Sequence, residues 1–266
     1  TRDAAAAFDK IVRLGRGGWC YEMNGLLGSA LQEIGFNVTF LAGGVMRDQM
    51  GDGVVGNHLV LLVRIGGDDW IGDVGFGDGL IDPAPLREGP TDGNPLDSHF
   101  RSIGGGWWRF ANDPKTGGPT FDFNPAVADE ALLEKNCRFL RSDPASPFVK
   151  NAVVQRWTDG AHLSLRGRVL RRLTASVDRK TLIASAGEYV GALKDLFEID
   201  VPQAARLWPR ICARHDDLFG DQGLQIIRRK FCVEIEPAIF LGDLKRFLKR
   251  AMIEFKHDIG IHLDEP

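Results

Sequence analysis

A pair of consecutive glycines, Gly66-Gly67, constrains the fold of this chain more than any other feature of its sequence. The run before it, residues 57–65, is almost entirely apolar, and the run after it, residues 68–74, has the composition of a second strand. A two-residue glycine turn between two such runs is typical of a β-hairpin. With the two glycines as the turn, Ile65 faces Asp68 and the strands form an antiparallel pair.

The register of this hairpin decides whether His58 and Asp73 can meet. With Gly66-Gly67 as the turn, Asp73 lies opposite Val60. His58 and Asp73 are then diagonal neighbours on one face of the sheet, roughly 7–8 Å apart at the backbone and within side-chain reach. A turn shifted by one residue would place them on opposite faces, leaving a core histidine and an acid at a turn or strand end.

The composition excludes several classes of protein. The 266 residues carry 33 Lys and Arg against 36 Asp and Glu, and this net charge of −3 argues against a dedicated nucleic-acid binder. No apolar stretch approaches the roughly 20 residues that cross a bilayer, and residues 1–10 lack the apolar core of a signal peptide. The four cysteines form no CxxC pair, and the histidines show no metal-ligand spacing. We expect a cytoplasmic protein with no metal, no membrane span and no nucleic-acid partner.

The apolar periodicity predicts a helical beginning, a β-rich middle and a mixed end. Helical spacing predicts helices over residues 20–34 and 185–197. Short apolar runs between turn residues predict strands over residues 38–42, 59–65, 70–74, 107–110, 153–157, 162–165 and 168–173. An apolar stripe flanked by Lys and Arg predicts an amphipathic helix over residues 241–259. We expect this helix to pack on its own chain, and the alternative is a helix that binds a membrane surface or a partner.

Cys20 begins the first predicted helix, directly after Gly17-Gly18 and Trp19. The unpaired N–H groups and the dipole of a helix N-terminus stabilise a thiolate. A lone cysteine at such a position is more often a small packed residue than a nucleophile. Together with His58 and Asp73, however, it would supply a nucleophile, a base and a carboxylate that orients the base.

The spacing of these residues separates the chain from two well-known groups of cysteine enzymes. Cys20 and His58 lie 38 residues apart. Papain-type enzymes place the histidine about 130–150 residues after the cysteine, and caspases place it before the cysteine. Neither pattern fits this chain.

Three segments together identify a family. They are Arg16-Gly17-Gly18-x-Cys20-x-Glu22-x-Asn24, then His58 at the start of an apolar strand, then Asp73-Val74-Gly75-Phe76-Gly77. A chain with these segments resembles the arylamine N-acetyltransferase family. The similarity continues through Asn124-Pro125, residues 142–148 and residues 166–170 to about Phe219, which is roughly four-fifths of the chain.

The resemblance implies an enzyme that moves an acetyl group from acetyl-CoA to the nitrogen of arylamines or arylhydrazines. The reaction would be ping-pong and pass through an acetyl-cysteine, with no metal. Cys20 would be the acyl-accepting nucleophile, His58 the base and Asp73 its orienting acid. The backbone N–H of Cys20 would be an oxyanion donor. Phe76 would line the pocket for the acceptor amine.

Further positions carry weaker implications from the same resemblance. Val54, Val55 and Asn57, just before His58, match positions implicated in contact with coenzyme A. Arg16 and Glu22 would form an ion pair that braces the loop before the cysteine. Whether the chain forms a homo-oligomer is left open.

The fold that the resemblance implies is α+β, with a papain-like Cys–His–Asp arrangement. Residues 1–35 would be a helical head that carries the cysteine, shorter than the first domain of the family. Residues 36–143 would form a central β-barrel that carries the histidine and the aspartate, and residues 144–219 an α/β lid. Residues 220–266 match nothing in the family and would be a C-terminal extension.

Two other interpretations of the same residues remain open. One is a transglutaminase- or peptidase-like acyl transfer with the same triad. The identity of the acyl donor that modifies Cys20 would distinguish this reaction from acetyl transfer. The other is an inactive binding module derived from the family, in which the shortened head no longer assembles the site. Cys20 would then be no more reactive than a model thiol.

Overall fold

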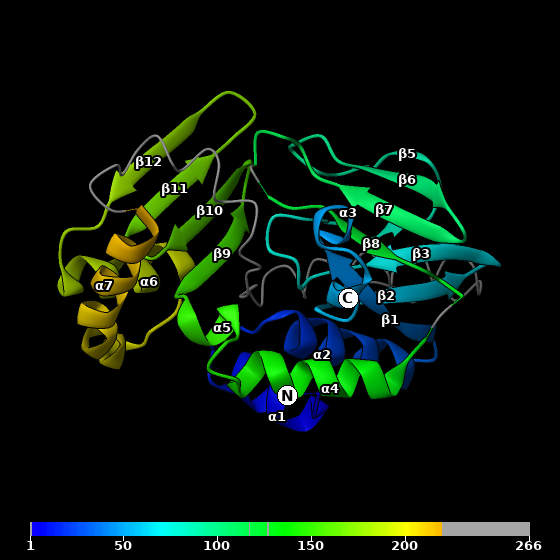
Figure 1. The fold of residues 1–266 in the computed structure, drawn as a ribbon, viewed down its shortest axis with the longest axis horizontal. Coiled ribbons are helices and arrows are strands. Elements are labelled where there is room, and N and C mark those ends of the chain that lie inside the picture. The colour runs from blue at the N-terminus through cyan, green and yellow to red at the C-terminus, as the bar shows by residue number, and fades with distance from the viewer. Residues whose placement is uncertain (1, 117, 127, 220–266) are drawn as a thin grey trace, which may run out of the picture.

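Two antiparallel sheets organise the computed structural model, which describes residues 2–219 except 117 and 127. The larger sheet has the strand order β4-β3-β2-β1-β8-β7-β6-β5, and the smaller sheet has the order β12-β11-β10-β9. Figure 1 shows the two sheets side by side, with α1, α2 and α4 along one side of the larger sheet and α6 and α7 beside the smaller one.

The elements have the following bounds. The larger sheet contains β1 (Asn37–Val45), β2 (His58–Ile65), β3 (Asp68–Gly72), β4 (Ala84–Pro85), β5 (Gly89–Pro90), β6 (His99–Gly104), β7 (Trp107–Ala111) and β8 (Phe121–Phe123). The smaller sheet contains β9 (Val153–Thr158), β10 (Ala161–Arg166), β11 (Val169–Leu173) and β12 (Asp178–Leu182). The helices are α1 (Ala4–Phe8), η1 (Asp9–Arg13), α2 (Cys20–Glu33), α3 (Arg47–Met50), η2 (Asp52–Val54), α4 (Glu130–Ser142), α5 (Pro147–Lys150), α6 (Ala186–Phe197), η3 (Pro202–Leu207) and α7 (Trp208–Phe219).

The hairpin formed by β2 and β3 has the register that the glycine pair predicts. Ile65 is paired with Asp68, and Leu61 is paired with Gly72. Both turn residues, Gly66 and Gly67, have positive φ values, of 59° and 94°. Residues with a Cβ atom rarely adopt this conformation, whereas glycine adopts it readily. The strand expected over residues 70–74 ends at Gly72, so the chain leaves the sheet just before Asp73.

The strand β2 is apolar on both faces because both faces are buried. Leu61 and Val63 point to a core formed with α1, η1 and α2. Val60 and Leu62 point to the opposite side, into a cluster dominated by phenylalanines. Since side chains alternate along a strand, His58 lies on the same side as Val60 and Leu62.

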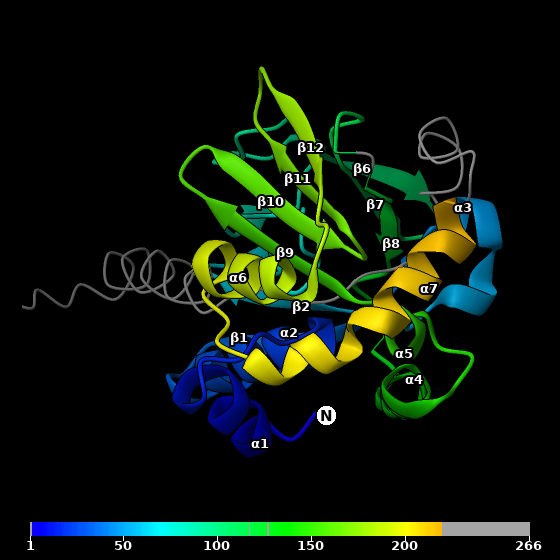
Figure 2. The same cartoon turned by 90° about the vertical axis from the view of Figure 1, so that its left-hand side faces the viewer.

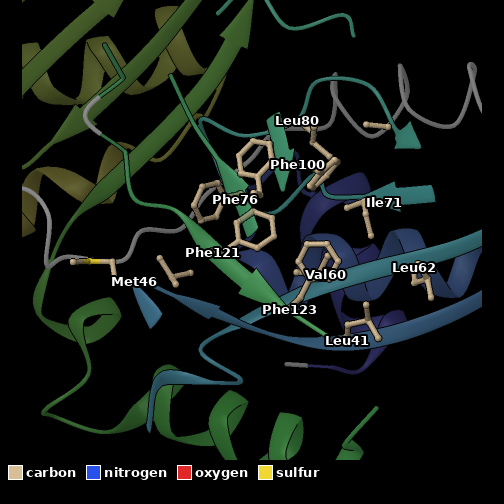
Figure 3. Close-up of a cluster of buried hydrophobic side chains, with 13 residues drawn as sticks. Leu41, Met46, Val60, Leu62, Ile71, Phe76, Leu80, Phe100, Phe121 and Phe123 are labelled. Carbon is tan, nitrogen blue, oxygen red and sulfur yellow. The ribbon is translucent and has the colours of Figure 1, made fainter. Parts of the chain in front are cut away.

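The phenylalanine cluster fills the concave side of the larger sheet, as Figure 3 shows for most of its members. The rings of Phe110 and Phe121 stack with their centroids 5.0 Å apart, and Phe76 meets Phe121 edge-on at 4.8 Å. Such offset and edge-to-face pairs add about 0.5–1.5 kcal/mol each to the burial of the rings. The cluster therefore forms a rigid wall on the His58 side of β2.

The smaller sheet is covered by helices from the end of the described chain. Leu163 and Leu165 of β10 pack in one cluster with Leu193 and Phe197 of α6 and with Ile211 of α7. Figure 2 shows α6 against this sheet, and α7 contacts α5, where Arg210 donates to the Val149 carbonyl. The helix predicted over residues 185–197 is present as α6.

The helix α4 was not expected from the periodicity. The Asp129 side chain caps it by accepting a hydrogen bond from the N–H of Leu132 at 2.8 Å. Its buried residues are Leu133, Cys137 and Leu140, whose spacing of four and three places them on one face. This narrow apolar stripe in an otherwise polar helix packs against the start of α2.

The α+β class expected from the sequence is confirmed. The larger sheet is curled into a half-barrel whose edges are β4 and β5. Within the described residues, no helix is both long enough and apolar enough to cross a membrane. The amphipathic helix expected over residues 241–259 lies outside the described residues.

The packing of α2 on the sheet predicts opposite effects for two glycines of that helix. A Cβ atom at Gly28 would lie 2.5 Å from the Phe40 ring and 3.1 Å from Leu61 Cδ2, whereas nothing lies within 4 Å of one at Gly25. Gly28→Ala should lower the free energy of unfolding by about 1–3 kcal/mol. Gly25→Ala should raise it by about 0.5–1 kcal/mol because alanine favours the helix. Urea denaturation measures both, and changes of the same sign would contradict the packing.

Candidate active site

Cys20 is the first residue of α2, and Trp19 precedes it as the N-cap with an extended backbone. The side chain is buried, with 1% of its surface exposed, and it packs in a cluster with Leu59 and Leu140. The first N–H groups of a helix have no acceptor within the helix, and they carry the positive end of its dipole. The Cys20 sulfur therefore lies at the positive end of the α2 dipole.

His58 and Asp73 meet as the hairpin register requires. His58 is the first residue of β2, and Asp73 follows the last residue of β3. His58 Nε2 lies 2.6 Å from Asp73 Oδ2, and both side chains are buried. Since Nε2 faces Asp73, Nδ1 is the ring nitrogen left for Cys20, whose side chain is close enough to raise the pKa of the imidazole.

Two opposing effects act on the imidazole. Burial by itself lowers the pKa of His58, because a charged ring loses its hydration. The charge of Asp73 and the hydrogen bonds to Asp73 and Cys20 outweigh burial and raise the pKa of His58 to about 10. The ring is therefore a cation at neutral pH.

Asn24 connects this pair to the helix that carries the cysteine. Its Nδ2 donates to Asp73 Oδ1 at 2.8 Å and to the carbonyl of Leu59 at 2.6 Å, while its Oδ1 accepts from the N–H of Val74 at 2.8 Å. Asn24 lies one helical turn after Cys20, on the same face of α2. Asn24 belongs to the motif around Cys20, but no role was expected for it, and its position four residues after Cys20 was the available signal.

The segment after Asp73 lies directly against the start of α2. The N–H of Gly75 donates to Asp73 Oδ1 at 2.9 Å. A Cβ atom at Gly75 would lie 2.5 Å from the Cα of Cys20 and 2.8 Å from Asn24 Nδ2. Only glycine permits this approach, which explains a glycine two residues after the acid.

Phe76 belongs to the phenylalanine cluster of the larger sheet and lies beside the His58 imidazole. The centroids of the Phe76 and His58 rings are 5.2 Å apart, and Phe121 lies 5.0 Å from the same imidazole. Phe76 is 7% exposed. The structure thus brings Phe76, the aromatic residue expected for the acceptor pocket, beside the imidazole of His58.

The residues expected to contact coenzyme A lie in two different environments. Asn57 is buried, and its side chain bonds the backbone of Val45 at both the N–H (2.8 Å) and the carbonyl (3.3 Å). Val55 packs against the cluster that contains Cys20. Val54 and Asn57 both line a cavity of about 360 Å³.

The ion pair expected between Arg16 and Glu22 is not formed. Among the described residues, it is Lys10 whose ammonium group bonds the Glu22 carboxylate. Lys10 belongs to η1, which packs under α2 and brings the ammonium to the first turn of that helix. The sequence could not reveal this partner, because the turn after η1 decides which cation reaches Glu22.

The chain matches a family model described as N-acetyltransferase over residues 2–206. The arylamine N-acetyltransferase of Mycolicibacterium smegmatis is 32% identical over 221 residues, covering 76% of this chain and 76% of that protein. Arylamine N-acetyltransferase 1 of Oryctolagus cuniculus is 30% identical over 231 residues, covering 75% of this chain and 78% of that protein.

Solved structures agree with the sequence comparisons. The arylamine N-acetyltransferase of M. smegmatis superposes with a TM-score of 0.70 at 30% identity, covering 80% of this chain and 81% of that one. The Mycobacterium marinum arylamine N-acetyltransferase in complex with CoA superposes with a TM-score of 0.68 at 28% identity, covering 80% and 81%.

A cysteine at a helix start, beside a His–Asp pair on an α+β scaffold, is an arrangement typical of cysteine-dependent acyltransferases and peptidases. The comparisons with known proteins identify one family within this class. The chain belongs to the arylamine N-acetyltransferase family, and it is a transferase.

The contacts of Asn24 predict a large effect of its removal. Asn24→Ala should lower the free energy of unfolding by at least about 2 kcal/mol, because the buried Leu59 carbonyl and Val74 N–H each lose a partner at about 1–3 kcal/mol. Ser29→Ala, on the half-buried side of the same helix, should change it by less than about 0.5 kcal/mol. Urea denaturation of both variants measures the difference, and equal effects would show that Asn24 does not hold the site together.

Proposed function

We propose that this protein transfers an acetyl group from acetyl-CoA to the nitrogen of an arylamine or arylhydrazine through an acetyl-cysteine at Cys20. The observation that supports this proposal most is the contact of Cys20 with the His58–Asp73 pair in a chain of this family. The structural relative solved with CoA supports a CoA thioester as the donor.

In the first half-reaction, the Cys20 thiolate attacks the carbonyl carbon of the acetyl thioester. The tetrahedral intermediate collapses to acetyl-Cys20 and expels the CoA sulfur, which takes a proton from the His58 imidazolium. The Cys20 N–H at the start of α2 is our candidate donor for the negative oxygen of this intermediate. The thioester is already activated, so a thiol nucleophile suffices without a metal.

In the second half-reaction, the amine nitrogen attacks the acetyl carbon, and the neutral His58 ring accepts the amine proton. Cys20 leaves as a thiolate, so the imidazolium–thiolate pair is restored. Asp73 fixes the orientation of the ring and stabilises its charged form. Phe76, against the ring, would form one wall of the acceptor site, and a flat aromatic amine suits such a wall.

The other interpretations differ in what reaches Cys20. A peptidase or transglutaminase would be acylated by an amide, and the family membership favours a thioester donor instead. Val54, Val55 and Asn57 remain our candidates for contact with the donor. An inactive module would have an unassembled site, whereas here the His58–Asp73 contact is 2.6 Å.

Intact-mass measurement after mixing with acetyl-CoA tests the proposal. The wild type should gain one acetyl group, lose it when an arylamine is added, and release one N-acetylated product. Cys20→Ala should gain no acetyl group and show no turnover, because the nucleophile is absent. Cys212→Ala is the matched control, since Cys212 is a free and more exposed thiol on α7. Acetylation of the Cys20→Ala variant at the wild-type rate would overturn the assignment, and acylation by a glutamine peptide instead of acetyl-CoA would favour the peptidase-like alternative.

A further inference from the structure

Residues 54–57 run from the end of η2 to the start of β2, directly before His58. They are named here the donor loop, because they include the candidates for contact with the acetyl donor. Three of the four backbone N–H groups of the loop donate within the same turn, to the carbonyls of residues 51, 52 and 54. The fourth, from Gly56, donates to the Gly43 carbonyl of β1 at 2.8 Å. A segment bonded mainly to itself opens locally unless side chains from other elements hold it.

Tyr21, the residue after the nucleophile, reaches the donor loop from α2. Its hydroxyl donates to the carbonyl of Gly56, two residues before His58. The side chain is fully buried, and its ring packs against Trp19 with the centroids 5.0 Å apart. Because the ring is packed in place, the hydrogen bond fixes the Gly56 carbonyl relative to the start of α2.

The Tyr21 hydroxyl keeps its proton and therefore remains a donor. Burial raises the pKa of Tyr21 far above its ordinary value of about 10, because a buried phenolate would lose its hydration. Cys20, its neighbour in the chain, adds to this rise. A carbonyl oxygen can only accept a hydrogen bond, so the bond to Gly56 needs the protonated phenol and is present throughout the neutral range.

The helix α4 contacts the same loop through Asn136. Its Nδ2 donates to the carbonyl of Leu132 at 3.0 Å and lies 3.5 Å from the carbonyl of Val55. A Cβ atom at Gly56, whose φ is 89°, would lie 2.6 Å from the same nitrogen, so only glycine allows this approach. At 3.5 Å the contact of Asn136 with the loop is weak. Tyr21 is therefore the stronger of the two contacts to the loop carbonyls.

The base is held by contacts that do not involve Tyr21. His58 Nε2 lies 2.6 Å from Asp73 Oδ2. The side chain of Asn57, at the end of the donor loop, bonds both backbone groups of Val45. Removal of the Tyr21 hydroxyl should therefore loosen residues 54–56 and leave the imidazole in place.

We propose that Tyr21 is a positioning residue for the acetyl donor: its hydroxyl holds the Gly56 carbonyl and thereby keeps the donor loop in a fixed position relative to Cys20. The proposal rests on the proposed function, in which Val54, Val55 and Asn57 contact the donor. Tyr21 acts through the backbone of the loop and touches no reacting atom. It therefore affects the half-reaction that uses acetyl-CoA and leaves the transfer to the amine unchanged.

The variant Tyr21→Phe tests this role, because it removes the hydroxyl and keeps the ring. The second-order rate constant for acetylation of Cys20 by acetyl-CoA, followed by intact mass, should fall about tenfold, as expected for the loss of one buried hydrogen bond. Alkylation of Cys20 by iodoacetamide should change by less than about twofold, because His58 stays in place. Transfer of the acetyl group from acetyl-Cys20 to an arylamine should also change by less than about twofold.

Tyr189→Phe is the matched control, since Tyr189 is the other tyrosine of the chain and is buried on α6. It should leave all three rates unchanged. A purely structural role of Tyr21 would lower the melting temperature of Tyr21→Phe and leave the ratios between the three rates as they are in the wild type. Unchanged ratios would overturn the assignment, whatever the melting temperature.

Failure of the proposed function would look different, because the wild type would then gain no acetyl group from acetyl-CoA. Hydrogen exchange of a peptide that contains residues 54–57, measured by mass spectrometry, would still test the anchoring of the loop. Faster exchange in Tyr21→Phe than in Tyr189→Phe supports the anchoring, and equal exchange in the two variants contradicts it.

Discussion

The buried carboxylate of Asp73 is the constraint on which the architecture of the site depends. A charge removed from water is costly unless hydrogen bonds and an opposite charge compensate for it. Asp73 receives this compensation from His58 at 2.6 Å, from Asn24 at 2.8 Å and from the N–H of Gly75 at 2.9 Å. These partners come from β2, from α2 and from the segment after β3, so the charge is stable only when all three are in place.

The contacts that satisfy Asp73 also position the nucleophile. Asn24 is one turn beyond Cys20, so the hydrogen bonds that join α2 to the hairpin set the distance between the thiol and His58. Phe76 and Phe121 cover the ring and exclude water from it. In this low-dielectric surrounding the attraction between Asp73 and the imidazolium is stronger than in water, and this attraction outweighs the cost of burying the ring.

Features that depend on neighbouring residues, such as the β2–β3 hairpin, could be predicted from the sequence. The glycine pair was sufficient to predict the β2–β3 register, and with it the shared face of His58 and Asp73. The helix α4 was missed because three buried residues in thirteen give a weak periodic signal. The partner of Glu22 depends on long-range packing, and so does the contact between Arg210 of α7 and the Val149 carbonyl of α5. No sequence motif predicts contacts between residues that lie so far apart in the chain.

The protonation state of His58 tests the central claim most directly, because it reports the balance between burial and the charge of Asp73. Nitrogen NMR of ¹⁵N-histidine-labelled protein can follow this ring through a pH titration, with His58→Gln identifying its signals. The account predicts a doubly protonated ring throughout the neutral range, which loses its proton only near pH 10, and a lower titration in Asp73→Asn. A ring that titrates near its ordinary value of about 6.5 in the wild type, or that is unaffected by Asp73→Asn, would contradict it.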